Sequence, residues 1–315
     1  MIEILLITNK KDVTTDFIIK NLRERNLNFY RFNTEDLSSK ISINFDFSLN
    51  SFILYDGEIE IDLLKIKSVY YRRPLIPDLE ANNLSIGEYN FAKAEITYTL
   101  EGFYKILQNA FWVSPIYAIR EAENKIFQLQ IAKQIGFVIP DSIITNIPKK
   151  ASDFLISHEA IIKPIKSGLI DEIDIEKVIF TTKVNENIEL ERVSYCPSYF
   201  QKFIDKYSDV RVTIVGDNVF AAKIYSQDYP ETKVDWRSAE NLKLRYEKFD
   251  LPIELAKKCI ELTKKLKLNF GAIDFVEDLY GNLIFLEINP NGQWAWIEKQ
   301  LGYPISNEIA NLLDI

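Results

Sequence analysis

Three polar residues near the C-terminal end have the chemistry and spacing of a cation site. Asp274 lies in one predicted strand, and Glu287 and Asn289 lie in the next one. Because Glu287 and Asn289 are two residues apart, they point to the same face of their strand. The connection turns around Tyr280-Gly281, and a hairpin that is symmetric about this turn places Asp274 opposite Glu287.

Two carboxylates that face each other across a sheet destabilise it unless something compensates their charge. A divalent cation with oxygen ligands gives that compensation, and Mg²⁺ that bridges phosphate groups fits best. We therefore expect Asp274, Glu287 and Asn289 to be metal ligands. The alternative is an exposed hairpin with one charged face.

Isolated lysines form a second set of candidates. Lys163 interrupts an apolar strand, where a lysine either protects a sheet edge or is a buried cation with an anionic partner. Lys125 comes early in its predicted helix, where backbone N–H groups favour anions. Lys166-Ser167-Gly168 follows the Lys163 strand and predicts a mobile loop that covers phosphates. The alternative for each of them is an ordinary surface residue.

A third pattern lies at 199–211, where an apolar strand leads into a loop of mixed charge and then a new strand. Asp209 and Arg211 are two apart on that strand and share a face. They either pair with each other or act on a ligand, and the spacing does not decide between the two.

Scarce residues exclude several classes of site. The chain has one histidine, His158, and two cysteines, Cys196 and Cys259, far apart in sequence, so a Ser-His-Asp relay, a multi-histidine zinc site and CxxC redox chemistry are not expected. The ten glycines form neither a G-x-G-x-x-G motif nor a Walker A motif. A net charge of −8 argues against a general nucleic-acid binder.

The elements that position these residues follow from hydrophobic periodicity. The first part of the chain predicts a small α/β domain, with a hairpin that turns at Asp56-Gly57. Its predicted strands are 2–7, 28–33, 41–47, 52–63 and 68–71, and its helices are 13–25 and 88–108. The remainder predicts a helix at 121–135, a strand-rich region, and a helix at 252–267 that Asp250 caps. Its predicted strands are 160–165, 177–184, 198–204, 210–215, 218–224, 270–277 and 283–289, before a short helix at 305–313. The chain shows neither a signal peptide nor an apolar run long enough to span a membrane, so we expect a soluble cytoplasmic protein.

The order of these motifs resembles the ATP-grasp ligases, collinearly from about residue 115 to the end. The motifs are Asn-Lys at 124–125, Ile-Ile-Lys-Pro at 161–164, Gln-Lys-Phe-Ile at 201–204, Asp-Val-Arg at 209–211, Asp-Trp-Arg at 235–237, Asp274 and Glu-Ile-Asn at 287–289. The segment 287–296, together with Tyr-Tyr-Arg-Arg-Pro at 70–74, is similar to the ATP-grasp peptide maturases of the microviridin and graspetide class.

This resemblance implies an α/β chain with the α+β ATP-grasp fold. A pre-ATP-grasp α/β domain at 1–115 would precede two α+β subdomains, at 116–200 and 201–315, that clasp the nucleotide. It also implies roles for individual residues. Nucleotide contacts would come from Lys125, Lys163, Lys166, Ser167, Gly168, Gln201, Phe203, Ile204 and Asp209, with Asp209 on the ribose. The ligands of two Mg²⁺ would be Asp274, Glu287 and Asn289, and the catalytic cations would be Arg211, Arg237 and Lys223. Substrate contacts would come from Arg72, Arg73, Arg120, Arg192 and Asn291.

The implied activity is ATP-dependent macrocyclisation of a ribosomal precursor peptide with a leader and an acidic core. An Asp or Glu side chain of the core would become an acylphosphate and then join a Ser/Thr hydroxyl as an ester or a Lys amine as an amide. Such a transfer needs positioning and charge neutralisation more than a protein nucleophile. We expect a homodimer or higher homo-oligomer without nucleic-acid or membrane partners. The alternatives are a ligase that adds amino acids to a small molecule or protein tail, and a non-catalytic peptide-binding protein on the same scaffold.

Overall fold

The computed structural model describes the chain except 80–83, 167–168, 173–174, 179–180, 185–187 and 238–241. The chain divides into two compact units. Unit 1 consists of Met1–Ile119, Lys267–Phe270 and Gln293–Ile315, and unit 2 consists of Arg120–Leu266 and Gly271–Gly292. A division of the ATP-grasp part at residue 200 stays a prediction.

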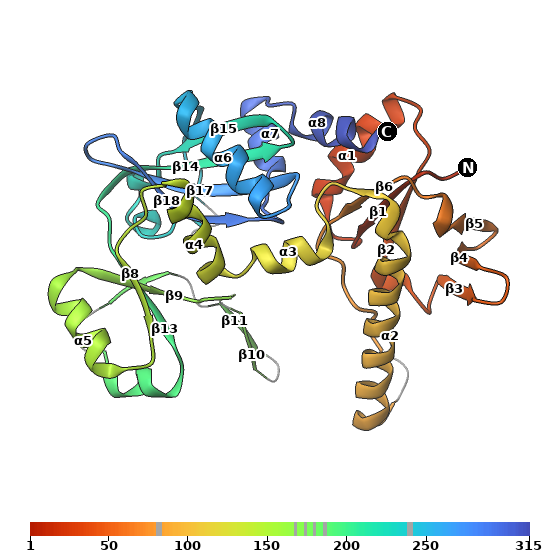
Figure 1. Ribbon diagram of the computed structural model, residues 1–315, viewed down its shortest axis with the longest axis horizontal. Coiled ribbons are helices and arrows are strands. Elements are labelled where there is room, and N and C mark those ends of the chain that lie inside the picture. Colours follow the sequence, from red (N-terminus) through yellow and green to blue (C-terminus); the bar gives the residue numbers. More distant parts are fainter. Residues whose placement is uncertain (80–83, 167–168, 173–174, 179–180, 185–187, 238–241) are drawn as a thin grey trace. The chain divides into compact units, whose positions relative to one another are not determined.

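Unit 1 is built on a parallel sheet with the strand order β2-β1-β6-β7 (Figure 1). The strands are β1 (Ile4–Thr8), β2 (Phe29–Asn33), β6 (Ser68–Tyr71) and β7 (Phe111–Trp112). All five residues of β1 are buried, as expected for a parallel strand that is covered on both faces. A second, antiparallel sheet contains β3 (Ile41–Asp46), β4 (Ser51–Asp56) and β5 (Ile59–Asp62), which confirms the predicted hairpin at Asp56-Gly57.

The helices of unit 1 begin at residues that satisfy their free N–H groups. Asp12 caps α1 (Val13–Glu24) by accepting from the N–H of Thr14, and Ser85 forms a capping box at the start of α2 (Ile86–Ile106). The C-terminal part adds α7 (Ala295–Leu301) and α8 (Ile305–Leu313), and α8 contacts α1. The apolar core gathers side chains from the sheet and from the C-terminal half of α2, and it includes Leu5, Ile7, Phe32, Val69, Leu100 and Phe103.

Unit 2 contains two antiparallel-paired sheets. The first has the order β12-β9-β13-β8, with β8 (Ser142–Thr145), β9 (Ala160–Lys163), β12 (Thr182–Lys183) and β13 (Ser198–Lys202). The second has the order β16-β15-β14-β17-β18, with β14 (Lys206–Val215), β15 (Asn218–Ile224), β16 (Tyr246–Lys248), β17 (Phe270–Asp278) and β18 (Leu283–Asn289). A separate hairpin pairs β10 (Leu169–Glu172) with β11 (Ile175–Val178). The helices are α3 (Ile116–Ala122), which begins in unit 1, α4 (Lys125–Ile135), α5 (Pro148–Ser157) and α6 (Ile253–Lys265).

Several sequence-based predictions differ from these elements. The predicted helix at 121–135 is interrupted, since α3 ends at Ala122 and α4 begins at Lys125. Asn124 lies between them and caps α4 by accepting from the N–H groups of Ile126 and Phe127. Asp250 does not cap α6, since Pro252 occupies the cap position. The predicted strand at 177–184 is two strands, β11 and β12, and helix α5 was not predicted.

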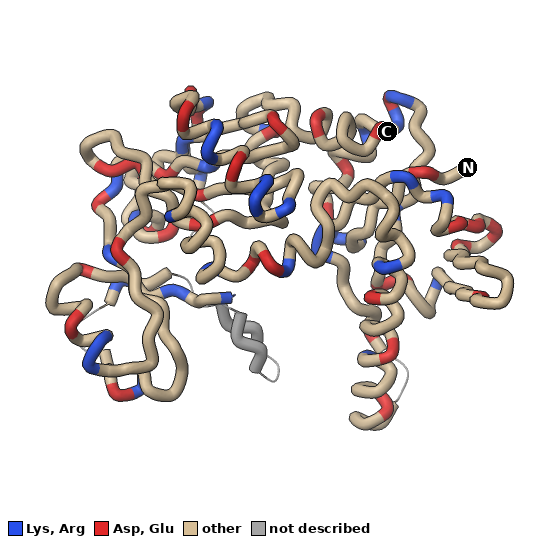
Figure 2. Tube along the Cα trace, in the orientation of Figure 1, with Lys and Arg blue, Asp and Glu red and all other residues tan. Residues whose placement is uncertain are grey.

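Charge is distributed along the whole described trace rather than gathered in one region. Figure 2 shows Lys and Arg segments intermixed with Asp and Glu segments in both units. Local cation-rich regions therefore depend on which side chains converge, which the chain trace alone does not show. None of the described helices combines the length and the apolar character that crossing a bilayer requires.

Arg72, predicted as a substrate contact, is a buried cation with partners inside unit 1. Its side chain is 1% exposed, and its Nε lies 3.3 Å from Oδ1 of Asp12. Its Nη2 donates to Oε1 of Gln293 at 2.7 Å. Asp12 also accepts from the hydroxyls of Thr8 and Thr15 at 2.8 and 2.6 Å. These contacts favour a structural role for Arg72, and its predicted contact with a substrate stays a prediction.

Replacement of Arg72 is therefore expected to reduce stability. Arg72→Met retains most of the side-chain volume but leaves the carboxylate of Asp12 buried without its cation, which typically costs about 3–5 kcal/mol of unfolding free energy. Arg23→Met, on the exposed face of α1, should change it by less than about 0.5 kcal/mol. Denaturant unfolding of both variants tests this, and equal stabilities would show that the Arg72 network contributes little.

Candidate functional site

The β17–β18 hairpin brings the predicted carboxylates together. Asp274 pairs with Glu287, as predicted, but the hairpin is not symmetric. Near the turn Phe275 pairs with Phe285, and the register shifts between Asp274 and Phe275. Leu286 is the extra residue of this bulge. If the register near the turn continued unchanged along the pair, Asp274 would lie opposite Leu286 instead of Glu287.

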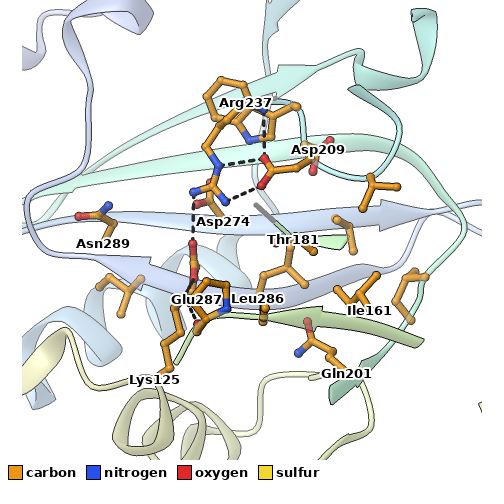
Figure 3. Close-up of a pocket in the computed structure, with 18 of the residues that line it drawn as sticks. Lys125, Ile161, Thr181, Gln201, Asp209, Arg237, Asp274, Leu286, Glu287 and Asn289 are labelled. Atoms are coloured by element: carbon orange, nitrogen blue, oxygen red, sulfur yellow. Dashed lines mark hydrogen bonds and ion pairs between the residues drawn. The ribbon is translucent and has the colours of Figure 1, made fainter. Parts of the chain in front are cut away.

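Three cations surround this acidic pair. Arg211 Nη1 lies 2.7 Å from Oδ2 of Asp274. Lys125 Nζ and Arg237 Nη1 lie 3.3 and 3.5 Å from the two oxygens of Glu287 (Figure 3). Burial raises the pKa of Asp274. Burial also acts to raise the pKa of Glu287, but the charges of Lys125, Lys163 and Arg237 outweigh it and lower that pKa to about 2.

A cavity of about 480 Å³ opens beside these groups, between the first sheet, α4 and the second sheet of unit 2. Its wall combines cations, carboxylates and apolar side chains, which suits a ligand with a flat apolar part and an anionic part. It brings together many of the predicted residues, namely Lys125, Lys163, Lys166, Gln201, Phe203, Ile204, Asp209, Arg237, Asp274, Glu287 and Asn289.

Lys163 is a buried cation in the wall of this cavity. It is 8% exposed, and its Nζ lies 4.9 Å from the centre of the Tyr199 ring. Within the described part of the chain, no carboxylate lies at ion-pair distance from Nζ. Burial lowers the pKa of Lys163 to about 8. The residue is therefore not a sheet-edge lysine, and its charge requires an anion that enters the cavity.

Gln201 presents an unsatisfied acceptor in the same wall. Its Nε2 donates to Ser142 Oγ at 3.0 Å and to the Tyr199 hydroxyl at 2.8 Å. Ser142 donates its own proton to the carbonyl of Pro140 at 2.8 Å, so it accepts from Gln201 and fixes the orientation of the amide. Oε1 of Gln201 is consequently buried without a protein partner among the described residues. A buried carbonyl of this kind favours a ligand that donates a hydrogen bond.

Asp209 and Arg211 do not pair with each other. Both oxygens of Asp209 accept from Lys206 Nζ, at 2.9 and 2.7 Å, whereas Arg211 contacts Asp274. A Cβ at Gly292 would lie 2.3 Å from Cβ of Ala272 and 3.3 Å from Nη2 of Arg211. The turn after β18 therefore requires glycine where it passes Arg211.

The geometry separates other predicted residues from the cavity. Arg211 is opposite Ala222 in the β14–β15 pair, and Lys223 is opposite Val210, so Lys223 lies on the other face of the sheet from Arg211. Its ammonium group pairs with Glu277 at 2.9 Å, and a catalytic role for Lys223 is not supported by this position.

Arg192 pairs with Glu189 on the surface. Arg73 and Arg120 are exposed, and their substrate contacts stay predictions, as does that of Asn291. Ser167 and Gly168 lie outside the described residues.

Two contributors were missed by sequence reasoning. Gln128 on α4 accepts from the N–H of Ile288 at 3.1 Å and donates to its carbonyl at 2.8 Å, which fixes β18 between Glu287 and Asn289. The second is Asp235, whose Oδ1 lies 2.9 Å from Nε of Arg237. Asp235 was visible as part of Asp-Trp-Arg, but spacing alone did not indicate its partner.

Two family descriptions match the chain in succession. The MvdD pre-ATP-grasp domain matches residues 3–120, and the RimK-like ATP-grasp domain matches residues 122–313. This chain belongs to the RimK-like ATP-grasp family. The acidic pair, the buried lysine and the cavity therefore lie in its ATP-grasp domain, and the sequence-based identification of the family and the fold is confirmed.

Solved structures similar to this ATP-grasp chain cover nearly all of it. A RiPP-associated ATP-grasp ligase from Chryseobacterium gregarium, in complex with ADP and a leader and core peptide, has 32% identity and a TM-score of 0.92, with 99% of this chain and 96% of that chain covered. The macrocyclase MdnC from Microcystis aeruginosa, bound with the precursor peptide MdnA, has 28% identity and a TM-score of 0.87, with 99% of each chain covered. A curated relative, the uncharacterized protein MG012 of Mycoplasma genitalium, is 34% identical over 95 residues, 30% of this chain, and the match spans 31% of the relative's length.

Nucleotide affinity is expected to depend on the protonation of Lys163. Phosphate groups bind the charged form, so ATP affinity should fall by up to about tenfold per pH unit as the pH rises above 8, the pKa in the empty site. Binding near pH 8.5 should also take up a proton. Calorimetry in buffers of different ionisation enthalpy measures this uptake, and Lys163→Met should abolish it. Lys149→Met, on the exposed face of α5, serves as the control, and pH-independent affinity of the native protein would contradict this role.

Gln201 is expected to select the base. Its Oε1, which has no donor among the described residues, would accept from the exocyclic amine of adenine, whereas guanine presents a carbonyl at the equivalent position. Gln201→Met should weaken ATP binding by about tenfold, the equivalent of one hydrogen bond, and should reduce the preference for ATP over GTP. Lys149→Met, on the exposed face of α5, leaves the Gln201 amide and its partners in place and should retain the preference. An unchanged ATP-to-GTP ratio in Gln201→Met would exclude this contact.

Proposed function

We propose that this protein uses ATP to form macrocycles in a ribosomally made precursor peptide. The observation that carries the proposal is the Asp274–Glu287 pair on the hairpin, surrounded by Lys125, Arg211 and Arg237 beside one cavity. Such a site neutralises and positions anions and contains no histidine relay. The similar proteins with a bound leader and core peptide, or with a precursor peptide, support a peptide substrate.

The cavity fits ATP on two observations. Lys163 is a buried cation with no carboxylate at ion-pair distance among the described residues, and Oε1 of Gln201 is a buried acceptor without a donor among them. Lys125 and Lys166 add positive charge to the same wall. We infer that the phosphates lie beside these lysines and that the adenine lies against Gln201, Phe203 and Ile204.

Magnesium fits the donor set of the hairpin. No cluster of three or more acidic, His or Cys side chains occurs in the described ranges, so the third protein ligand would be the amide oxygen of Asn289. That oxygen accepts from the N–H of Asn291 at 3.0 Å and retains a second lone pair. Asp274, Glu287 and Asn289 would hold two Mg²⁺ ions, which would supply charge neutralisation at the transferred phosphoryl group.

The chemistry follows from the charges that the chain supplies. An Asp or Glu carboxylate of the peptide attacks the γ-phosphorus of ATP, which forms an acylphosphate and releases ADP. A Ser/Thr hydroxyl or a Lys amine of the same peptide then attacks the acyl carbon, and phosphate leaves. Arg211 and Arg237 neutralise the phosphoryl and acyl oxygens through planar, bidentate groups. Each ring that forms removes one water from the peptide.

The choice between ester and amide, a homo-oligomeric state, a cytoplasmic location and the absence of nucleic-acid partners remain predictions within this proposal. Arg73, Arg120 and Asn291 are the proposed peptide contacts. They are not among the residues that line the cavity, so their replacement would change peptide affinity more than ATP affinity.

The proposal is tested with the short peptide encoded beside the gene, which should be rich in Thr and Glu near its C-terminus. Incubation with ATP and Mg²⁺ should yield ADP and a peptide lighter by one water per ring, as measured by mass spectrometry. Glu287→Gln should fold normally and lose turnover by at least about 100-fold, since it removes a ligand charge from the site.

Two results would contradict the proposal. Release of ADP with free amino acids as acceptors, but without dehydration of the peptide, would favour an amino-acid ligase. Tight peptide binding without ADP release would favour a non-catalytic peptide-binding protein. Near-native turnover of Glu287→Gln would remove the metal assignment alone.

A further inference from the structure

Asp235 holds Arg237 by three hydrogen bonds. Its Oδ1 accepts from the backbone N–H of Arg237 at 3.0 Å and from Nε at 2.9 Å, and its Oδ2 accepts from Nη2 at 3.1 Å. Asp235 is 6% exposed and lines the cavity. This fork fixes the plane of the group as well as its position.

The fork leaves one end of the guanidinium group directed at the acidic pair. Nη1 of Arg237 points to Glu287, with a distance of 3.5 Å to Oε1. The Arg237 side chain is otherwise 44% exposed, so packing does not hold it. A long side chain with this exposure samples several rotamers unless a partner restrains it.

The segment that carries Asp235 is itself anchored. The carbonyl of Val234 accepts from Nζ of Lys206 at 3.4 Å, and Lys206 is held by both oxygens of Asp209. The fork is therefore attached to β14 on one side and directs Arg237 toward β18 on the other.

We propose that Asp235 is a positioning residue for the reaction, which acts through Arg237; this inference rests on the proposed function. In the structure Nη1 contacts Glu287. When the oxygens of Glu287 bind metal, the same N–H edge is available to the reacting phosphoryl or carboxyl oxygens. Because Asp235 holds the opposite edge throughout, the guanidinium group needs little reorganisation during the reaction.

The test substitutes Asp235→Asn. The asparagine oxygen still accepts from the backbone and from Nε, but its amide group faces Nη2, so that donor meets donor. We expect kcat for ring formation to fall by about 10- to 100-fold, as for other residues that orient a functional group. The dissociation constants of ATP and of the precursor peptide should change by less than about threefold, since Asp235 contacts neither in this proposal.

A double-mutant cycle separates positioning from a general structural role. In an Arg237→Lys protein, lysine cannot form the fork, so adding Asp235→Asn should change kcat by less than about threefold. Equal losses in both backgrounds, or a normal kcat for Asp235→Asn alone, would overturn the proposal. Asp235→Ser, which retains an acceptor for the backbone N–H, provides the same comparison if the asparagine variant does not fold.

The native enzyme is assayed first. A native enzyme that forms no rings would contradict the proposed function. A native enzyme that forms rings at the same rate as Asp235→Asn would contradict this inference alone.

Discussion

The repulsion between two buried carboxylates is the constraint on which the rest of the site depends. Asp274 and Glu287 lie directly opposite each other in the β17–β18 pair, and the sheet tolerates this because Arg211, Lys125 and Arg237 supply opposite charge. The charges of Lys125, Lys163 and Arg237 keep Glu287 ionised, with a pKa of about 2.

The supporting residues keep this pair in one geometry. The side-chain amide of Gln128 forms hydrogen bonds with both the N–H and the carbonyl of Ile288. Gly292 lets the chain pass close to Arg211. Asp235 holds Arg237 by a fork. These contacts use buried or part-buried polar groups, so each one restrains a side chain or strand that would otherwise be mobile next to the cavity.

Unit 1 uses charge differently. Arg72 and Asp12 form a buried pair together with Gln293 and two threonine hydroxyls, all within unit 1. The two sets of arginines show why residue type alone is a weak guide. Arg72 and Arg211 are both nearly inaccessible to solvent, yet one has a carboxylate of the core as its partner and the other has a carboxylate of the candidate site.

The sequence by itself determined the family, the main strands and the opposition of Asp274 and Glu287. Strand alternation and the order of motifs can be read along the chain without knowledge of its tertiary contacts. The opposition was reached through an assumed symmetry, and only the structure shows that a bulge at Leu286 produces it. The burial of Arg72 and the face of Lys223 could not be read from spacing, since each depends on which distant residues lie beside it. The pairing of Asp209 with Lys206, three residues away, was also not apparent, because Arg211 is nearer in sequence but pairs with Asp274 instead. Tertiary structure also decided the partner of Asp235, because only the folded chain places Arg237 between Asp235 and Glu287.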